Sequence, residues 1–279
     1  MKKTSIIFLG ISLIIIIVGF ILKGCGASSA SLLGIDLFKQ TITEEGNLVE
    51  VFEFSSDETN KVNIDISNVD INIIGGAEKS YAEIINLNSL EYSAFDNNRA
   101  FTINDDIVSS LIGRAEGGSF GFNGVRDFLR FEKHNDEKVI NIYVADNSAV
   151  KIFDIKIDKG NITVDNIKSE CDYVISINNG NFSCKNTTDI SLVKTDIKNG
   201  NVNLDNVYMS NSEICIENGN VNLSTPKTTP NFYKVKCEVG TIYYNNDKHN
   251  GIYNFNIIDK KENVNINVGV GDVNIKTID

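Results

Sequence analysis

Carboxylates are the residues of this sequence with the clearest chemical potential. Asp158, Asp196 and Glu217 lie near recurring glycine-containing turns, and Asp165 and Asp205 follow such turns closely. Paired carboxylates can act as the acid and base of a glycan-cleaving enzyme, and they can also bind calcium. These carboxylates do not all converge in one column of the repeat described below, and the basic residues are scattered. A solvated surface explains them better, and a glycan-degrading β-helix enzyme that uses Asp196 and Asp205 is the alternative.

Other reactive side chains show no arrangement that predicts catalysis. The five cysteines form no Cys-x-x-Cys pair and no Cys/His spacing typical of zinc sites. Cys184 and Cys237 occupy positions where neighbouring repeats carry Val, Leu or Ile, so we predict that they are small core side chains. The two histidines, His134 and His249, lie in polar segments without a Ser/His/Asp set. The sequence therefore indicates no enzyme, no metal and no cofactor.

Composition excludes one class of partner. The 279 residues carry 26 Lys and Arg against 37 Asp and Glu, a formal net charge of −11 at pH 7. Nucleic-acid binding requires clustered positive charge against the phosphates, so we expect no nucleic-acid partner. With 42% hydrophobic residues, the chain is long enough to bury a sizeable core.

The N-terminal segment predicts a membrane anchor. Lys2 and Lys3 precede 17 uncharged, mostly apolar residues, IIFLGISLIIIIVGFIL (6–22). A helix of this length spans about 26 Å, which is enough to cross a bilayer. The lysines favour a cytoplasmic N-terminus, so we expect a single-pass anchor in residues 1–25 and an extracytoplasmic body. The alternative is lipidation of Cys25, although Lys23 departs from the pattern of a lipoprotein cleavage site.

A short motif recurs through the second half of the chain, as in DIKNGNVNLD (196–205) and IENGNVNLST (216–225). Ser67 takes the same place in VNIDISNVDINI (62–73). A motif that recurs at a nearly fixed spacing is typical of proteins built from stacked structural repeats. Its glycines are spaced by 20, 20, 19, 21 and 31 residues, and they are Gly160, Gly180, Gly200, Gly219, Gly240 and Gly271.

We call the six glycines and Ser67 the corners of the repeat. When the sequence is aligned on these seven corners, four columns of equivalent positions emerge: five and three residues before the corner, and two and four residues after it. Only Thr195 is not apolar among the 28 positions, and the residues between the columns are mostly polar. This is the period-two pattern of β-strands on both sides of a turn. The columns therefore predict the core of an all-β protein.

Two architectures fit the repeat. Each Asn-Gly could be the turn of a hairpin, which would give stacked antiparallel β-hairpins. Alternatively, each repeat is one rung of about 20 residues in a right-handed β-solenoid, which we favour because its length is nearly constant and like residues fill each column. The glycines would then turn the corners. A side-chain amide ladder would join the residues that follow them, Asn161, Asn181, Asn201 and Asn220.

The expected domain plan follows from these features. Residues 1–25 are the anchor, residues 26–40 are a linker of mainly small residues, and residues 41–279 are the solenoid domain. The repeat is interrupted by a long insertion at about 76–135. Excursions of this length are more often functional or disordered than structural.

The anchor and the repeats resemble a bacterial family of uncharacterised, membrane-anchored cell-envelope proteins labelled "putative adhesins", whose repeat region is called a toastrack domain. The resemblance covers roughly residues 40–279, and its clearest segments are IKIDKGNITVDNI (155–167) and ICIENGNVNL (214–223). It implies a non-enzymatic binding, adhesion or envelope-stress-sensing role at the cell membrane. The implied partner is a cell-envelope protein or a glycan, and no catalytic residues are carried over.

Overall fold

The computed structural model describes residues 41–42, 47–87, 92–96, 99–105, 137–187, 190–228, 231–257 and 262–279. These residues form strands, turns and loops, and none of them forms a helix that could span a membrane. The strands are β1 (Thr41–Ile42), β2 (Leu48–Glu53), β3 (Lys61–Asn68), β4 (Asp70–Ala77), β5 (Tyr81–Ile85), β6 (Tyr92–Asp96), β7 (Ala100–Asp105), β8 (Val139–Ala145), β9 (Ile152–Lys159), β10 (Ile162–Asp165), β11 (Cys171–Asn179), β12 (Phe182–Lys185), β13 (Ile190–Asn199), β14 (Val202–Asp205), β15 (Ser212–Asn218), β16 (Val221–Pro226), β17 (Asn231–Val239), β18 (Ile242–Tyr244), β19 (Asp247–His249), β20 (Ile252–Asn256), β21 (Glu262–Val270) and β22 (Val273–Ile278).

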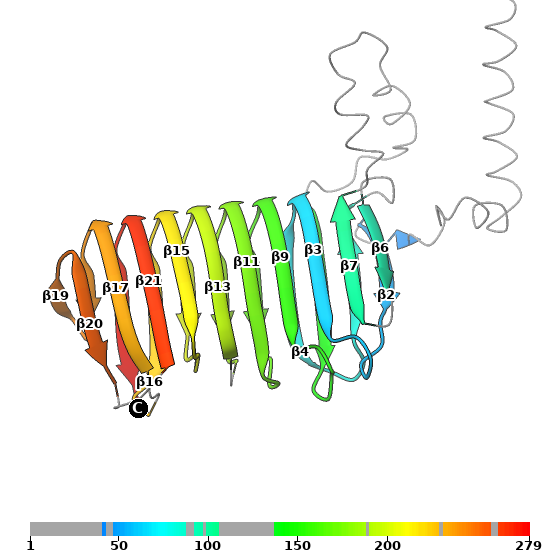
Figure 1. Cartoon of the computed structure of the whole chain (residues 1–279). Helices are drawn as coiled ribbons and strands as arrows, with labels where there is room; N and C mark the ends of the chain where they lie inside the picture. The colour runs from blue at the N-terminus through cyan, green and yellow to red at the C-terminus, as the bar shows by residue number, and fades with distance from the viewer. Residues whose placement is uncertain are drawn as a thin grey trace, which may run out of the picture. The chain divides into compact units, whose positions relative to one another are not determined.

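The strands form two sheets that face each other across a common core (Figure 1). Sheet A has 12 strands in the order β1-β2-β5-β8-β4-β10-β12-β14-β16-β22-β18-β19. Sheet B has 10 strands in the order β20-β17-β21-β15-β13-β11-β9-β3-β7-β6. Each corner glycine connects a strand of sheet B to a strand of sheet A. Gly160, for example, lies between β9 of sheet B and β10 of sheet A.

Successive repeats stack in parallel and in register. Ile162 pairs with Ile71 on one side and with Phe182 on the other. A hairpin turn would place its two strands side by side in one sheet, whereas these corners join strands of different sheets. At the corners the stacked-hairpin alternative is therefore wrong, and the chain coils as a β-solenoid. The right-handed sense of the coil stays a prediction.

The four predicted columns form the core. Of their 28 positions, 27 are buried, and Tyr244 packs partly buried against the same core. Alternate residues point outward, so the strands have mostly apolar inner faces, and along most of the repeat the outer faces are polar. Thr195 is 2% exposed, and its Oγ1 atom has no hydrogen-bond partner among the described residues. The one polar residue in the columns is thus also an unsatisfied one.

The predicted corner at Ser67 is wrong by two residues. Ile64 pairs with Ile155 and Ile71 pairs with Ile162, so the residue equivalent to Gly160 is Val69. A strand pattern of period two looks the same after a shift of two residues, so the alternation could not reveal the error.

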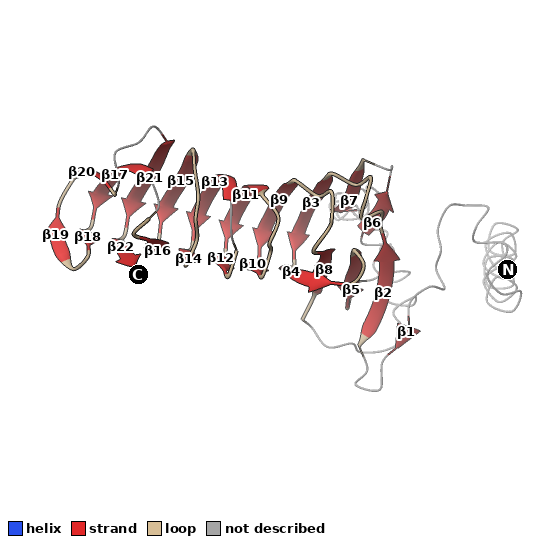
Figure 2. Ribbon diagram, turned by 90° about the horizontal axis from the view of Figure 1, so that it is seen from below, coloured by secondary structure: helices blue, strands red, loops and turns tan. Residues whose placement is uncertain are grey.

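Both ends of the solenoid depart from sequence order. The C-terminal strands β21 and β22 lie between the rung of β15 and β16 and the rung of β17 and β18, and Figure 1 shows β21 between β15 and β17. The Gly271 rung therefore separates the Gly219 and Gly240 rungs, which follow each other in the sequence. At the other end, β7 and β8 stack on β3 and β4. Antiparallel strands cover the two ends, with β5 and β6 at one and β19 and β20 at the other (Figure 2).

Residues 42–279 make up one unit of the chain, and it contains the solenoid. The expected anchor (1–25) and linker (26–40) lie outside the described residues. Within the expected insertion at 76–135, the described residues include the end of β4 and form β5, β6 and β7, and residues 88–91, 97–98 and 106–135 lie outside the described part.

Candidate functional site

The corner glycines allow the rungs to approach closely. All six have φ between 142° and 153°, a region that favours glycine. A Cβ atom on Gly200 would lie 1.7 Å from the carbonyl oxygen of Gly180 in the next rung. No Cβ atom can lie this close to a carbonyl oxygen. These glycines are therefore required for the close approach of neighbouring backbones and not for binding a ligand.

The four asparagines that follow the corners hydrogen-bond to one another. The backbone N and the Nδ2 of Asn201 donate to Oδ1 of Asn181 at 2.9 and 3.0 Å. Asn181 donates in the same way to Asn161, at 3.2 and 2.9 Å, and Asn220 donates to Asn201, at 2.9 and 3.2 Å. Each Oδ1 in the middle of the ladder thus accepts two hydrogen bonds.

Aspartates occupy the two ends of this ladder. Oδ1 of Asp70 accepts from the backbone N of Asn161 at 2.6 Å and from its Nδ2 at 3.2 Å. At the other end, the backbone N of Asp272 donates to Oδ1 of Asn220 at 2.7 Å, and Oδ1 of Asp272 accepts from Thr241 N at 2.8 Å. An aspartate suits the ends of the ladder because an ionised carboxylate only accepts hydrogen bonds and has no NH2 group that would need a further acceptor. The asparagine side chains of the ladder thus bond to one another and to the aspartates at its ends, so the ladder is a structural element.

The carboxylates considered for catalysis do not meet. Asp196 is exposed on the outer face of sheet B, and Asp205 is exposed on the outer face of sheet A. The core lies between them, so they form no acid–base pair across a substrate.

The cysteines of the described region are buried or half-buried free thiols. Cys171, Cys184 and Cys237 are buried, and Cys215 is half-buried. Burial raises the pKa of the Cys184 thiol to about 12, which keeps it neutral and unreactive. Cys25, the alternative lipidation site, lies outside the described residues.

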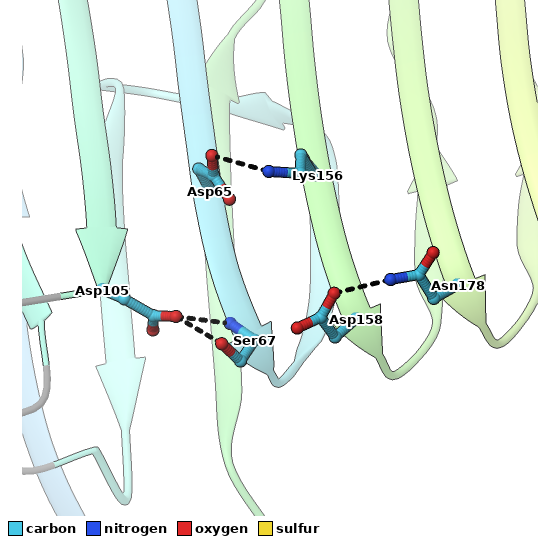
Figure 3. A network of polar contacts seen from close by, with 6 residues as sticks. All are labelled: Asp65, Ser67, Asp105, Lys156, Asp158 and Asn178. Atoms are coloured by element: carbon cyan, nitrogen blue, oxygen red, sulfur yellow. Dashed lines mark hydrogen bonds and ion pairs between the residues drawn. The ribbon is translucent and has the colours of Figure 1, made fainter. Parts of the chain in front are cut away.

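Sheet B presents charged and polar side chains on its outer face near β3. Oδ2 of Asp105 accepts hydrogen bonds from the backbone N and the Oγ of Ser67, the former at 3.0 Å. The Lys156–Asp65 ion pair at 3.3 Å has both side chains more than 60% exposed, so it contributes little stability. No group of three His, Cys, Asp or Glu residues in the described part of the chain could hold a metal. Figure 3 shows this network, which consists of Asp65, Ser67, Asp105, Lys156, Asp158 and Asn178.

Sheet A carries a different kind of surface near its N-terminal end. On the outer faces of four adjacent strands, β2, β5, β8 and β4, apolar and tyrosyl side chains alternate with the core residues. Val51 is 51% exposed, and the others are half-buried. We call this surface the tyrosine patch, and it consists of Val49, Val51, Ile74, Tyr81, Ile85, Val139 and Tyr143.

Strand register assembles the tyrosine patch. Tyr81 lies opposite Tyr143, and Ile85 lies opposite Val139. The two tyrosine rings stack with centroids 4.4 Å apart and planes 15° apart. Between these rows, Nδ2 of Asn141 donates to Glu83 Oε2 at 3.4 Å. The patch therefore surrounds a small polar centre.

The tyrosines of the patch are neutral hydrogen-bonding groups. Burial, followed by the Glu83 charge and a hydrogen bond to Glu83, raises the pKa of Tyr143 to about 12. Burial and then Glu83 also raise the pKa of Tyr81. Both phenols keep their protons at neutral pH, so the patch offers hydroxyl, amide and carboxylate groups within an apolar surround.

The part of the sheet A surface next to the tyrosine patch is polar. The next three strands, β10, β12 and β14, present no apolar side chain on their outer face. Their outward residues are Thr163, Asp165, Ser183, Lys185, Asn203 and Asp205. The tyrosine patch is thus a local feature of one end of the sheet.

Sequence reasoning missed the tyrosine patch. YAEII (81–85) and VINIY (139–143) both alternate, with Ala82, Ile84, Ile140 and Ile142 buried. Apolar residues also stand at the outward positions, and this was the available signal. Their adjacency depends on the pairing of β5 with β8, which the repeat does not include.

A family model matches this chain, whereas the similar solved structures share little sequence identity with it. A search of curated proteins finds no match. A crystal structure named "putative cell adhesion protein", from Clostridium sporogenes, is 18% identical with a TM-score of 0.47, and covers 83% of this chain and 99% of its own. A "putative adhesin" from Bacteroides fragilis is 10% identical with a TM-score of 0.41, and covers 85% of this chain and 99% of its own. The model of the Toastrack DUF4097 family matches residues 59–278, which is most of the chain, and the protein therefore belongs to that family.

Proposed function

We propose that the protein is a non-enzymatic binding protein of the cell envelope, and that the tyrosine patch contacts its partner. The observation that carries this proposal is the concentration of apolar and tyrosyl side chains on β2, β5, β8 and β4. The three following strands present only polar side chains. Contiguous exposed apolar surface on a soluble domain typically marks an interaction site.

The side chains of the patch favour a protein partner over a glycan. The rings of Tyr81 and Tyr143 stack on each other, so each turns one face to the other tyrosine rather than to solvent. A sugar ring would need such a face to stack on. Tyrosines among aliphatic residues, with a few hydrogen-bonding groups, are typical of the centre of protein–protein interfaces.

The cellular setting belongs to the same proposal. Residues 1–25 form a single membrane anchor with the N-terminus in the cytoplasm, and the solenoid lies on the outer side of the membrane. Binding there serves attachment to another envelope component. The crystal structures named as adhesion proteins support this reading, as does the absence of an acid–base pair at Asp196 and Asp205.

Site-specific photo-crosslinking in intact cells tests the proposal. A photoreactive amino acid is placed at Val51 in the patch, and in a control at Ser183, which is also outward-facing on sheet A. We expect a discrete crosslinked protein from position 51 and none from position 183. Equal crosslinking from both positions, or crosslinks to glycan alone, would contradict a protein-binding patch.

An activity assay separates binding from catalysis. The full chain, kept in solution by a mild detergent, is incubated with wall and capsule polysaccharides. We expect no turnover. Sustained cleavage that is lost in Asp196→Asn and Asp205→Asn variants would refute the non-enzymatic role.

A further inference from the structure

The last strand of sheet B, β20 (Ile252–Asn256), has an edge that no described strand covers (Figure 2). It pairs antiparallel with β17 on its other side. Cys237 N donates to Gly251 O at 2.9 Å. Hydrogen bonding alternates along an antiparallel strand, so residues 253 and 255 also bond toward β17. Ile252, Asn254 and Asn256 therefore direct their backbone N–H and C=O groups to the open edge.

This edge lacks the features that usually protect a terminal strand. Natural proteins protect such edges with charged side chains, proline, bulges or very short strands. β20 is five residues long, IYNFN, with no charge and no proline, and Ile252 is 61% exposed. By contrast, β19 at the edge of sheet A has three residues, and they include Asp247 and Lys248. The other terminal strand of sheet B, β6, ends in the charged Asp96, so β20 is the terminal strand of that sheet without a charged residue.

We propose that β20 pairs with β20 of a second copy of this chain, antiparallel and about a two-fold axis at Asn254. The three open positions then satisfy one another. Asn254 bonds to Asn254 of the partner subunit, and Ile252 bonds to Asn256 of the partner subunit. This gives about six backbone hydrogen bonds, two for each of three residue pairs. The two solenoids join end to end through a continuous sheet.

The same register continues the aromatic packing at this end of the core. Tyr253 and Phe255 point inward from β20, and the ring of Phe255 lies 4.9 Å from that of Tyr233 and 4.1 Å from that of Tyr244. Across the axis, Tyr253 faces Phe255 of the partner subunit. Aromatic pairs on directly opposite strand positions stabilise antiparallel pairing.

A second copy fits this edge better than an unrelated strand. The pairing is isologous, so it closes at two chains and leaves no further β20 edge exposed. The chain carries a net charge of −11, which opposes self-association, yet β20 contributes no charge to the contact. This contact is separate from the tyrosine patch, which lies at the opposite end of the sheet order, so either can fail without the other.

Mass measurement with one lysine substitution tests the proposal. Asn254→Lys places two like charges together on the axis. Asn265→Lys is the matched control, because Asn265 lies in the same row on β21 and also has Lys234 as its direct neighbour. Light scattering on the detergent-solubilised full chain should give a dimer for the wild type and for Asn265→Lys. It should give a monomer for Asn254→Lys, with an unchanged circular-dichroism spectrum.

Cysteine crosslinking provides an independent measurement. In a Cys25→Ser, Cys215→Ser background, Asn254→Cys should form a disulfide-linked dimer on mild oxidation, because paired residues of this type have Cα atoms about 5.5 Å apart. Asn265→Cys should not form one. A monomeric wild type at micromolar concentration, or a dimer that persists in Asn254→Lys and fails to crosslink through Asn254→Cys, would overturn the proposal.

Discussion

Removal of one asparagine from the ladder should destabilise the solenoid more than removal of an asparagine from a strand face. Asn201→Ala eliminates three side-chain hydrogen bonds. One is donated by its Nδ2 to Asn181, and two are accepted by its Oδ1 from Asn220. Asn203 is the matched control. It lies two residues further on, and its Oδ1 accepts one bond, from Asn222 Nδ2 at 2.8 Å.

The magnitude follows from the number of bonds lost. A hydrogen bond that is partly exposed contributes about 0.5–1 kcal/mol net, so Asn201→Ala should cost about 1.5–3 kcal/mol and Asn203→Ala about 0.5–1 kcal/mol. With an m-value of about 2–3 kcal/mol/M in urea, a loss of about 2 kcal/mol lowers the unfolding midpoint by about 0.7–1 M.

Urea unfolding of the detergent-solubilised full chain, followed by far-ultraviolet circular dichroism, measures the difference. Asn201→Ala should shift the midpoint at least twice as far as Asn203→Ala at an unchanged m-value. Equal shifts for the two variants would show that the ladder contributes no more to stability than an ordinary surface contact. This result would refute the predicted stabilising role of the ladder.

Three further changes are predicted from single contacts. Thr195→Val should raise the free energy of unfolding by about 1 kcal/mol, because it removes a buried hydroxyl that has no hydrogen-bond partner in the described structure. An unchanged or lower melting temperature would contradict this prediction. Gly200→Ala should lower the free energy of unfolding by more than about 3 kcal/mol, because its Cβ would lie 1.7 Å from the carbonyl oxygen of Gly180. Gly251→Ala should lower it less, because Gly251 is also at positive φ but faces open space. Equal losses of stability in thermal unfolding would contradict the predicted clash. The pKa of Tyr143 is raised from 10.0 to about 12, so the folded state holds this proton more tightly than the unfolded chain. Stability from this group is complete below pH 10 and is lost as the pH rises to 12, and a Tyr143→Phe variant with the same alkaline stability loss as the wild type would disprove it.

Much of the core could be predicted from alternation alone. A column such as Ile157, Ile177 and Ile197 repeats at 20-residue spacing and needs no knowledge of distant contacts. The Cys184 and Cys237 predictions are confirmed for the same reason, since both side chains are at most 2% exposed. Stacking forces like residues into one column, and the sequence records this directly.

Other features depend on pairings that a repeat cannot specify. The Ser67 corner is wrong because a two-residue shift preserves strand alternation. The rung of Gly271 lies between those of Gly219 and Gly240, and a constant spacing contains no information on which neighbours touch. The tyrosine patch requires β5 and β8 to pair although they are distant in sequence. Thus local periodicity predicts the rungs, whereas non-local pairing decides their order and surface.

Radical footprinting of tyrosines in intact cells tests most directly whether the tyrosine patch is a binding surface. Modification of Tyr81 and Tyr143 is compared between cells and the purified chain, and Tyr208, which is also half-buried, is the internal reference. If the patch contacts a partner, Tyr81 and Tyr143 become protected in cells relative to Tyr208. Equal modification of all three tyrosines in both settings would contradict the proposed binding role of the patch.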